Sequence, residues 1–277
     1  MIYEILDNRI RVHACAQFDP AHVLDCGQIF RYSAVDDGYV VHSLDKRCHI
    51  VPEGDGWAIH TDAKDYFVHY FDLERDYEVV KSNVAVTPIM REATAFGHGI
   101  RILNQDFFEM IVSFIISANN HIPRIKAIIE RICTALGKDM GDYHAFPTPA
   151  ELASADAEFF RSIGAGYRAE YLENTAKRLA SEDFRAWLDL PTNELHKRLV
   201  SLMGVGPKVA DCILLFGAGR TDVFPVDTWI KKVYHQHFGT EQNPALIRKN
   251  LLTLFGSNAG YAQQYLFYMK RELEKKF

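Results

Sequence analysis

Short segments of alternating apolar and polar residues fill the N-terminal third of the chain. They are rich in β-branched and aromatic residues, and turn-forming residues at 36–38 and 52–56 separate them. The segments are RIRVHACAQF, IFRYSAV, GYVVHSL, RCHIVPE and WAIHT. Repeated short strands at this spacing predict an antiparallel sheet, and residues 65–82 are predicted to form a short helix that leads out of it.

From residue 105 onward the apolar residues recur three and four positions apart, which is the period of an amphipathic helix. Pro147-Thr148-Pro149 and Pro191-Thr192 mark the starts of two helices, and Thr192 or Asn193 is expected to cap the second. Helices are predicted within 105–118, 123–136, 149–163, 168–180, 192–203, 227–238, 244–256 and 258–276.

The change of period predicts an α+β protein. We expect an N-terminal β-rich domain with an antiparallel sheet over residues 1–100 and an all-helical domain over residues 101–277. The final helices are expected to pack back near the N-terminal domain.

The formal net charge of −5 over 277 residues does not by itself favour a nucleic-acid partner. The acidity is N-terminal, because residues 1–100 carry 9 basic and 16 acidic side chains, whereas residues 101–277 carry 22 and 20. A local basic face in the second region remains compatible with DNA, since affinity depends on the charges that meet phosphate.

The cysteine pattern and the hydropathy narrow the class of protein. Five cysteines without close pairs, at positions 15, 26, 48, 133 and 212, argue against a disulfide framework and a four-cysteine metal site. No apolar run approaches the ~20 residues that span a bilayer, and the first residues do not resemble a secretory signal peptide. We therefore expect a cytoplasmic monomer, associated with the nucleoid if it binds DNA, without a membrane partner.

The most informative segment is LVSLMGVGPKVADCILLFGAGRTDVFPVDTW, residues 199–229. A helix ending at Met203 is predicted to meet Gly204-Val205-Gly206, and a second helix to begin near Pro207. The exposed N–H groups of such a turn can bind a phosphate oxygen of a DNA backbone without reading sequence. A plain helical hairpin with a glycine turn is the alternative interpretation.

Lys208 lies in the first turn of this second helix. A cation is disfavoured there by the helix dipole, so the position would lower the pKa of the amine and suit a nucleophile. A lysine that grips phosphate, or is merely exposed, fits equally well in isolation. Cys212 is four residues further on and shares the helix face, although a small buried residue is its commoner role.

Asp227 follows Lys208 by nineteen residues, after an extended Phe224-Pro225-Val226 run. It is placed to cap the helix that starts after it. A capping aspartate remains ionised, so a catalytic carboxylate and an N-cap are compatible interpretations of the same residue.

The combination of hairpin, LMGVGPKVAD and PVDTW resembles the helix-hairpin-helix base-excision DNA glycosylases. The resemblance implies that Lys208 and Asp227 are catalytic, and that Lys208 attacks the sugar to form a Schiff base that permits strand nicking. It also implies that Gly204, Val205, Gly206 and Trp229 contact the DNA backbone.

Further segments in family order resemble the 8-oxoguanine DNA glycosylases of this superfamily. They are CGQIFR (26–31), SFIISANNHIPRI (113–125), GAGYRAEY (164–171) and AQQYLF (262–267). The match implies that the Gly27 carbonyl accepts the N7 hydrogen of the oxidised base, and that Asn119, Arg124, Tyr167 and Arg168 fill the gap and read the opposite cytosine. The implied base pocket consists of Gly27, Cys212, Phe216, Gln263 and Phe267.

The chain departs from the family pattern at two of these positions. Trp229 stands where eukaryotic members have histidine, and Phe216 where methionine is common, so the backbone contact at Trp229 must differ. The C-terminal four-cysteine iron–sulfur cluster of the endonuclease III branch is absent. No cofactor is expected to be required, although a structural alkali or calcium ion at the hairpin would fall near the carbonyls of Val200, Leu202 and Val205.

The resemblance implies a bifunctional DNA glycosylase and AP lyase that excises 8-oxoguanine opposite cytosine from double-stranded DNA. A glycosylase for another lesion, such as alkylated purines, is the nearest alternative, but that branch usually lacks the lysine. A non-catalytic DNA-binding module or a helical interaction protein would need no lysine and aspartate at this spacing.

Overall fold

The computed structural model describes residues 2–13 and 17–275, so Cys15 lies outside the described residues. The chain forms two compact units. Unit 1 comprises Met1–Ile29, Ile50–Asn104 and Gly219–Phe277, and unit 2 comprises Phe30–His49 and Gln105–Ala218. The sequence-based division at residues 100 and 101 marks the change from strands to helices and stays a prediction. Among the described residues, no helix has the length and apolar character needed to cross a membrane.

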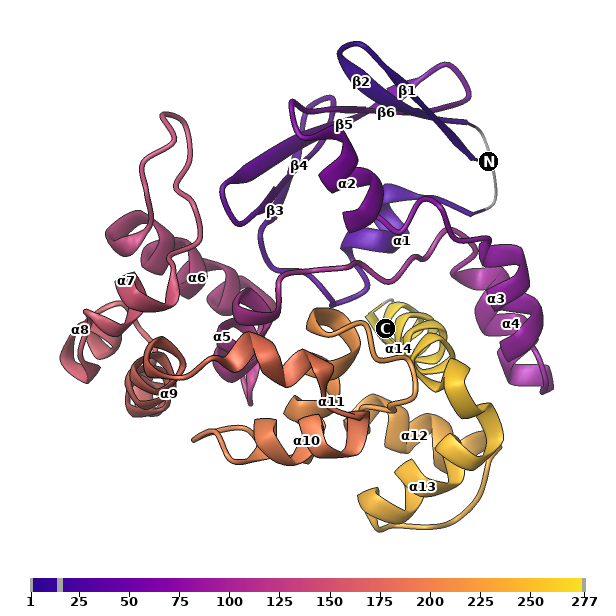
Figure 1. Ribbon diagram of the computed structural model, residues 1–277. Helices are drawn as coiled ribbons and strands as arrows, with labels where there is room; N and C mark the ends of the chain where they lie inside the picture. The colour runs from indigo at the N-terminus through magenta and orange to yellow at the C-terminus, as the bar shows by residue number, and fades with distance from the viewer. Residues whose placement is uncertain (1, 14–16, 276–277) are drawn as a thin grey trace. The chain divides into compact units, whose positions relative to one another are not determined.

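The predicted strands form a six-stranded sheet in the order β1-β2-β6-β5-β4-β3 (Figure 1). In β2 the alternation is plain, because Ile10 and Val12 are fully buried while Arg9 and Arg11, which alternate with them, are not. Ile10 pairs with Ile59 of β6, which sets the register of the buried face. The strands are β1 (Tyr3–Leu6), β2 (Arg9–Val12), β3 (Tyr32–Val35), β4 (Gly38–Ser43), β5 (Lys46–Glu53) and β6 (Gly56–His60).

Unit 1 carries two helices where one was predicted over residues 65–82. The break occurs at Asp72, whose φ of 50° no helix accommodates, and Asp76 then caps the next helix by accepting from Glu78 N at 2.9 Å. Helix α14 packs against α3, α4, α12 and α13. The helices of unit 1 are α1 (Pro20–Leu24), α2 (Lys64–Tyr70), α3 (Tyr77–Val84), α4 (Pro88–Phe96), α12 (Thr228–His237), α13 (Pro244–Phe255), the 3-10 helix η3 (Gly256–Asn258) and α14 (Ala259–Lys275).

Unit 2 contains the helical hairpin. Its helices differ from the predicted ones in three places. The helix predicted over 149–163 is two helices, because Asp156 caps a new one by accepting from Phe159 N. The N-cap at the start of α10 is Pro191, without a side-chain cap from Thr192 or Asn193, and α10 ends at Val200 rather than Met203. The helices are α5 (Phe107–Ser117), α6 (Ile122–Leu136), α7 (Pro149–Ala153), α8 (Ala157–Ser162), η1 (Gly166–Arg168), α9 (Ala169–Ser181), η2 (Phe184–Asp189), α10 (Thr192–Val200) and α11 (Pro207–Gly217).

A buried ionic group ties the β3–β4 hairpin to α5 and α6 within unit 2. Arg31 is 2% exposed and donates to Glu130, to Leu44 O and to His144 O. Glu109 is 4% exposed and accepts from the backbone N–H of Leu44 at 3.1 Å. Burial raises the pKa of Glu109 to about 7, although Arg31 and the Leu44 hydrogen bond act in the opposite direction.

Glu109→Gln is expected to stabilise the protein more at about pH 8 than at about pH 5. The folded state binds the Glu109 proton more tightly than the unfolded state, so this contribution to stability is present below the unfolded pKa and is lost as pH rises through about 7. The amide still offers an oxygen to Leu44 N. The difference in free energy of unfolding between variant and wild type should change by about 2 kcal/mol between these pH values, measured by urea denaturation. The exposed Glu158→Gln should show no such change.

Candidate active site

The α10–α11 hairpin in unit 2 is built around two glycines with different requirements (Figure 1). Gly204 has φ +84°, and a Cβ there would lie 2.4 Å from the Tyr171 ring, so both conformation and space demand glycine. Gly206 has φ −85°, and a Cβ there would meet nothing within 4 Å. Since folding does not explain glycine at Gly206, its open side is suited to close approach by a ligand backbone.

The two glycines are expected to separate folding from DNA binding. Gly204→Ala should destabilise the protein by about 2 kcal/mol or more, because it combines backbone strain with overpacking against Tyr171. Gly206→Ala should leave the melting temperature nearly unchanged and weaken binding to a DNA duplex. Thermal denaturation and fluorescence anisotropy measure the two effects, and equal losses of stability in both variants would contradict this division.

Lys208 follows Pro207 in the first turn of α11, as predicted, and its side chain is exposed. Cys212 lies one turn further on and is buried, while Phe216 is buried and stacks on Phe114 at 5.6 Å. Helix α11 packs against α5 through this apolar face. The helix therefore anchors its far end in the core of unit 2 and presents Lys208 at its N-terminal end.

Asp227 belongs to unit 1 and is the N-cap of α12. Its carboxylate accepts from Ile230 N at 2.9 Å, which confirms the predicted helix start. The preceding Phe224-Pro225-Val226 run is buried, which fixes the backbone that leads into the cap. Trp229 follows in the first turn and is half-buried, with Lys232 Nζ 4.6 Å from its ring.

In unit 2 the structure brings together the residues predicted to fill the gap in DNA. Asn119 is exposed and has φ +50°, the left-handed conformation that often ends a helix, directly after α5. Arg168 is 3% exposed and donates to the carbonyls of Ala118 and Asn119. Tyr167 is 54% exposed and its hydroxyl donates to Ala118 O. The guanidinium of Arg168 thus holds the turn that presents Asn119.

Arg124 lies at the start of α6 and donates to the carbonyl of Gly164 at 2.9 Å. Its side chain is exposed. This bond links the N-terminal end of α6 to the segment that carries Tyr167 and Arg168. Hydrogen bonds thus connect the segments that carry the four predicted residues, of which Arg168 is buried and the other three are exposed.

In unit 1 three predicted base-pocket residues lie together. Gly27 has φ +81°, and a Cβ there would lie 3.1 Å from both Phe267 and Arg271. Gln263 is one helical turn before Phe267 on α14 and is 5% exposed. Its Oε1 is buried without a hydrogen-bond partner among the described residues. An unpaired buried acceptor costs about 1–3 kcal/mol, which a ligand that donates to it would recover.

Two glutamines that sequence reasoning assigned no role hold the Gly27 turn in place. Gln264 donates to Cys26 O at 2.7 Å, and Gln28 is fully buried between the carbonyls of Val23 and Arg101 and the N–H of Leu103. In the sequence, the sign of this role was that Gln28 and Gln264 are polar residues within otherwise apolar segments. Because buried amides are normally fully hydrogen-bonded, such residues indicate a positioned backbone.

Comparison with known proteins decides the family. Residues 112–256 match the model of HhH-GPD superfamily base excision DNA repair proteins, which is more than half of the chain. The chain belongs to the HhH-GPD superfamily. Residues 11–111 match the N-terminal domain of 8-oxoguanine DNA glycosylase. The recognition made from the sequence motifs and the α+β fold class are both confirmed.

Solved and curated relatives agree with this assignment to the HhH-GPD superfamily. One similar solved structure is the crystal structure of Clostridium acetobutylicum 8-oxoguanine glycosylase/lyase in complex with double-stranded DNA containing cytosine opposite 8-oxoguanine. The two sequences are 37% identical, and the structures superpose with a TM-score of 0.93 over 99% of this chain and 100% of that chain. The N-glycosylase/DNA lyase of Saccharomyces cerevisiae is 31% identical over 74% of this chain and 65% of its own length. A probable N-glycosylase/DNA lyase of Methanothermobacter thermautotrophicus is 36% identical over 61% and 62%. The chain thus spans just under two thirds of these two curated relatives.

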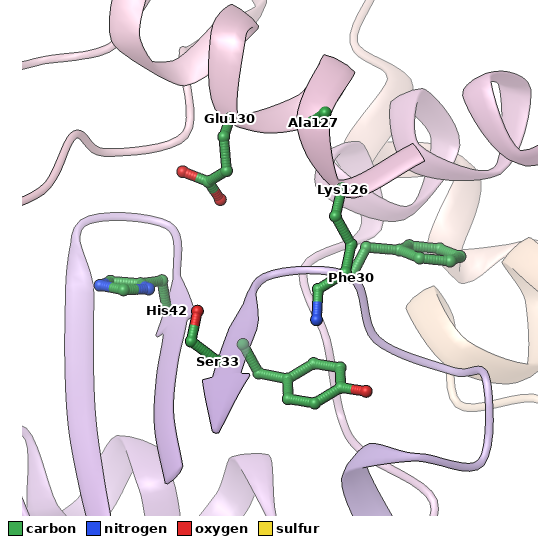
Figure 2. Close-up of a pocket in the computed structure, with 7 residues that line it drawn as sticks. Phe30, Ser33, His42, Lys126, Ala127 and Glu130 are labelled. Carbon is green, nitrogen blue, oxygen red and sulfur yellow. The ribbon is translucent and has the colours of Figure 1, made fainter. Parts of the chain in front are cut away.

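Unit 2 of this HhH-GPD protein has a pocket of about 270 Å³ that none of the predicted site residues lines (Figure 2). It lies between the β3–β4 hairpin and α6, and Lys126 Nζ is 3.5 Å from the ring of Tyr32. Burial lowers the pKa of His42 on its wall to about 4, and Arg31 adds to the effect. The lining residues are Phe30, Tyr32, Ser33, His42, Lys126, Ala127 and Glu130, none of which was predicted to bind the damaged base.

The backbone of the α10–α11 hairpin is compatible with the predicted cation site but does not by itself indicate that a cation binds there. The carbonyl of Leu202 accepts from Val205 N at 3.1 Å. A carbonyl has a second lone pair, so this bond does not prevent coordination. The cation stays a prediction.

Proposed function

We propose that the protein is a bifunctional DNA glycosylase and AP lyase that excises 8-oxoguanine opposite cytosine from double-stranded DNA. The observation that carries the proposal is the arrangement of Gly27 against Phe267, with the unpaired amide oxygen of Gln263 one helical turn away. A purine with a hydrogen at N7 would stack on Phe267, donate to Gly27 O and use the orphaned acceptor of Gln263. A protein with this substrate would act at the nucleoid.

The damaged nucleotide must leave the stack before its sugar is accessible, which costs a few kcal/mol. Asn119 and Tyr167 would offset this cost by filling the gap, and Arg124 would contact the orphaned cytosine. Asn119 is exposed on the turn that Arg168 holds, and the exposed Tyr167 donates its hydroxyl to the same turn, so both are available to a duplex. The amides at Gly204–Gly206 and the Trp229 side chain would hold the backbone.

The pocket would distinguish oxidised guanine from guanine by one hydrogen. The carbonyl of Gly27 pairs with the N7–H of 8-oxoguanine, whereas it would face the lone pair of guanine N7. An unpaired buried acceptor costs about 1–3 kcal/mol, which gives about one to two decades of selectivity. Further selection must therefore come from flipping and from the stacking of the base on Phe267.

In the chemical step the neutral amine of Lys208 forms a bond to C1′ as the bond from C1′ to the base breaks. The base departs with the bonding electrons and takes up a proton. The carboxylate of Asp227 stabilises the positive charge that develops on the sugar. Ring opening gives a Schiff base, and loss of a C2′ proton then expels the 3′ phosphate and nicks the strand.

A panel of duplexes tests the proposal directly. Each carries one lesion opposite each of the four bases, and release of the base and strand cleavage are scored separately. We expect both products with 8-oxoguanine opposite cytosine and little with 3-methyladenine or undamaged guanine. Excision of alkylated purines without cleavage of the oxoguanine duplex would instead favour the alternative specificity.

A further inference from the structure

Three metal-ligating side chains meet in unit 1 outside the proposed base pocket. Asp19, His22 and His98 each offer one ligand atom, and these atoms all lie within 4.8 Å of one another. Asp19 is the N-cap of α1 and His22 lies in the first turn of that helix, while His98 lies in the loop after α4. The rings of His22 and His98 are 4.7 Å apart, edge to face.

The backbone holds the two segments together before any ion binds. Asp19 N donates to Gly99 O at 3.1 Å, and Gly99 N donates to His22 Nδ1 at 3.3 Å. A Cβ on Gly99 would lie 2.4 Å from the Asp19 Cβ, so glycine permits this close approach. The backbone segments that carry the three side chains are therefore already held together, which reduces the conformational entropy that metal binding would cost.

We propose that Asp19, His22 and His98 form a binding site for a divalent transition-metal ion of the zinc class. Two imidazoles and one carboxylate are the donors such ions prefer, whereas magnesium and calcium prefer oxygen alone. Three protein ligands leave a fourth position for water.

The hydrogen bond from Gly99 N to His22 Nδ1 affects how His22 would bind the ion. Binding through Nδ1 replaces the hydrogen bond from Gly99, and binding through Nε2 moves the ring proton to Nδ1 and also gives up that bond. Either arrangement loses one long hydrogen bond, so the affinity is expected to be moderate.

The proposed metal site lies near Gly27 and Phe267, which we propose contact the damaged base. Helix α1 leads within three residues into Gly27, and the His22 ring lies 5.3 Å from that of Tyr268, the neighbour of Phe267. A bound ion would thus fix the start of α1 to the 97–99 loop behind this segment.

Titration of the untagged, chelator-treated full chain with zinc chloride tests the proposal. We expect one saturable site, which His98→Gln weakens by at least about tenfold. The matched control His60→Gln, also exposed in unit 1, should bind like wild type. Asp19→Asn should weaken binding while keeping the α1 cap, since asparagine caps as well as aspartate. Circular dichroism of the metal-free variants verifies that they are folded.

Cobalt(II) spectroscopy separates this site from the cysteines. The expected spectrum has visible d–d bands that His98→Gln removes, and lacks the near-ultraviolet charge-transfer band of a thiolate ligand. The proposal is overturned by zinc affinity unchanged in His98→Gln, by a thiolate band, or by no saturable binding at ~1 mM zinc.

Discussion

Lys208→Gln is expected to abolish covalent trapping of the protein on DNA and to remove strand cleavage. Borohydride reduces a Schiff base to a stable secondary amine, so wild-type protein should form an adduct with an 8-oxoguanine:cytosine duplex. Glutamine has no nucleophilic amine, and loss of the nucleophile in such a unit typically costs ~10³–10⁶ in rate. Lys208 is exposed at the N-terminal end of α11, so we expect the variant to fold.

A matched surface lysine controls for loss of charge. Lys177 is 60% exposed and makes one ion pair with Glu173 on the same helix, so Lys177→Gln should form the adduct at the wild-type rate. Circular dichroism should show both variants folded. An adduct that persists in Lys208→Gln would assign the nucleophile to another amine.

Asp227→Asn is expected to lower the excision rate by about 10²–10³ with almost no loss of stability. Asparagine and aspartate are equally good N-caps, so the bond to Ile230 N and the start of α12 should survive. The variant loses the negative charge that we propose stabilises the developing positive charge on the sugar. Single-turnover excision at saturating enzyme isolates this step from binding.

A second aspartate that caps a helix serves as the control for Asp227→Asn. Asp156 caps α8 by accepting from Phe159 N at 2.8 Å and has no proposed part in the chemistry. Asp156→Asn should leave both the melting temperature and the excision rate unchanged. If Asp227→Asn excises within about twofold of wild type, Asp227 is a structural cap only.

The fold was predictable where one pattern dominates and failed where local signals compete. Alternation in β2 and the helical period of α6 gave these elements correctly, because each buries one face. Helix α5 was also predicted correctly, although all of its residues except Ser117 are buried. The strand β1 was missed because none of its four residues is buried, so it lacks the alternation of buried and less buried positions that β2 shows. The segments 65–82 and 149–163 were each taken for one helix, since an internal aspartate that caps a second helix is also a common surface residue.

The candidate site was predictable as motifs but not as geometry. The hairpin glycines, Lys208 and the cap at Asp227 follow from local rules, and the structure places each as those rules require. The bond from Gln264 to Cys26 O joins residues 238 positions apart, and no local pattern encodes it. The same holds for His98 beside Asp19, which depends on how α1 meets the loop after α4.

Arg168 sets a kinetic condition on any reading of the opposite base. Its guanidinium already donates to Ala118 O and Asn119 O, and its side chain is buried. To contact a cytosine it must exchange these carbonyls for the base, so the energy gained is only the difference between two sets of hydrogen bonds. Arg168 would then distinguish opposite bases by how fast it rearranges after the protein meets the DNA. A duplex with the wrong opposite base would dissociate before the arginine has changed partners.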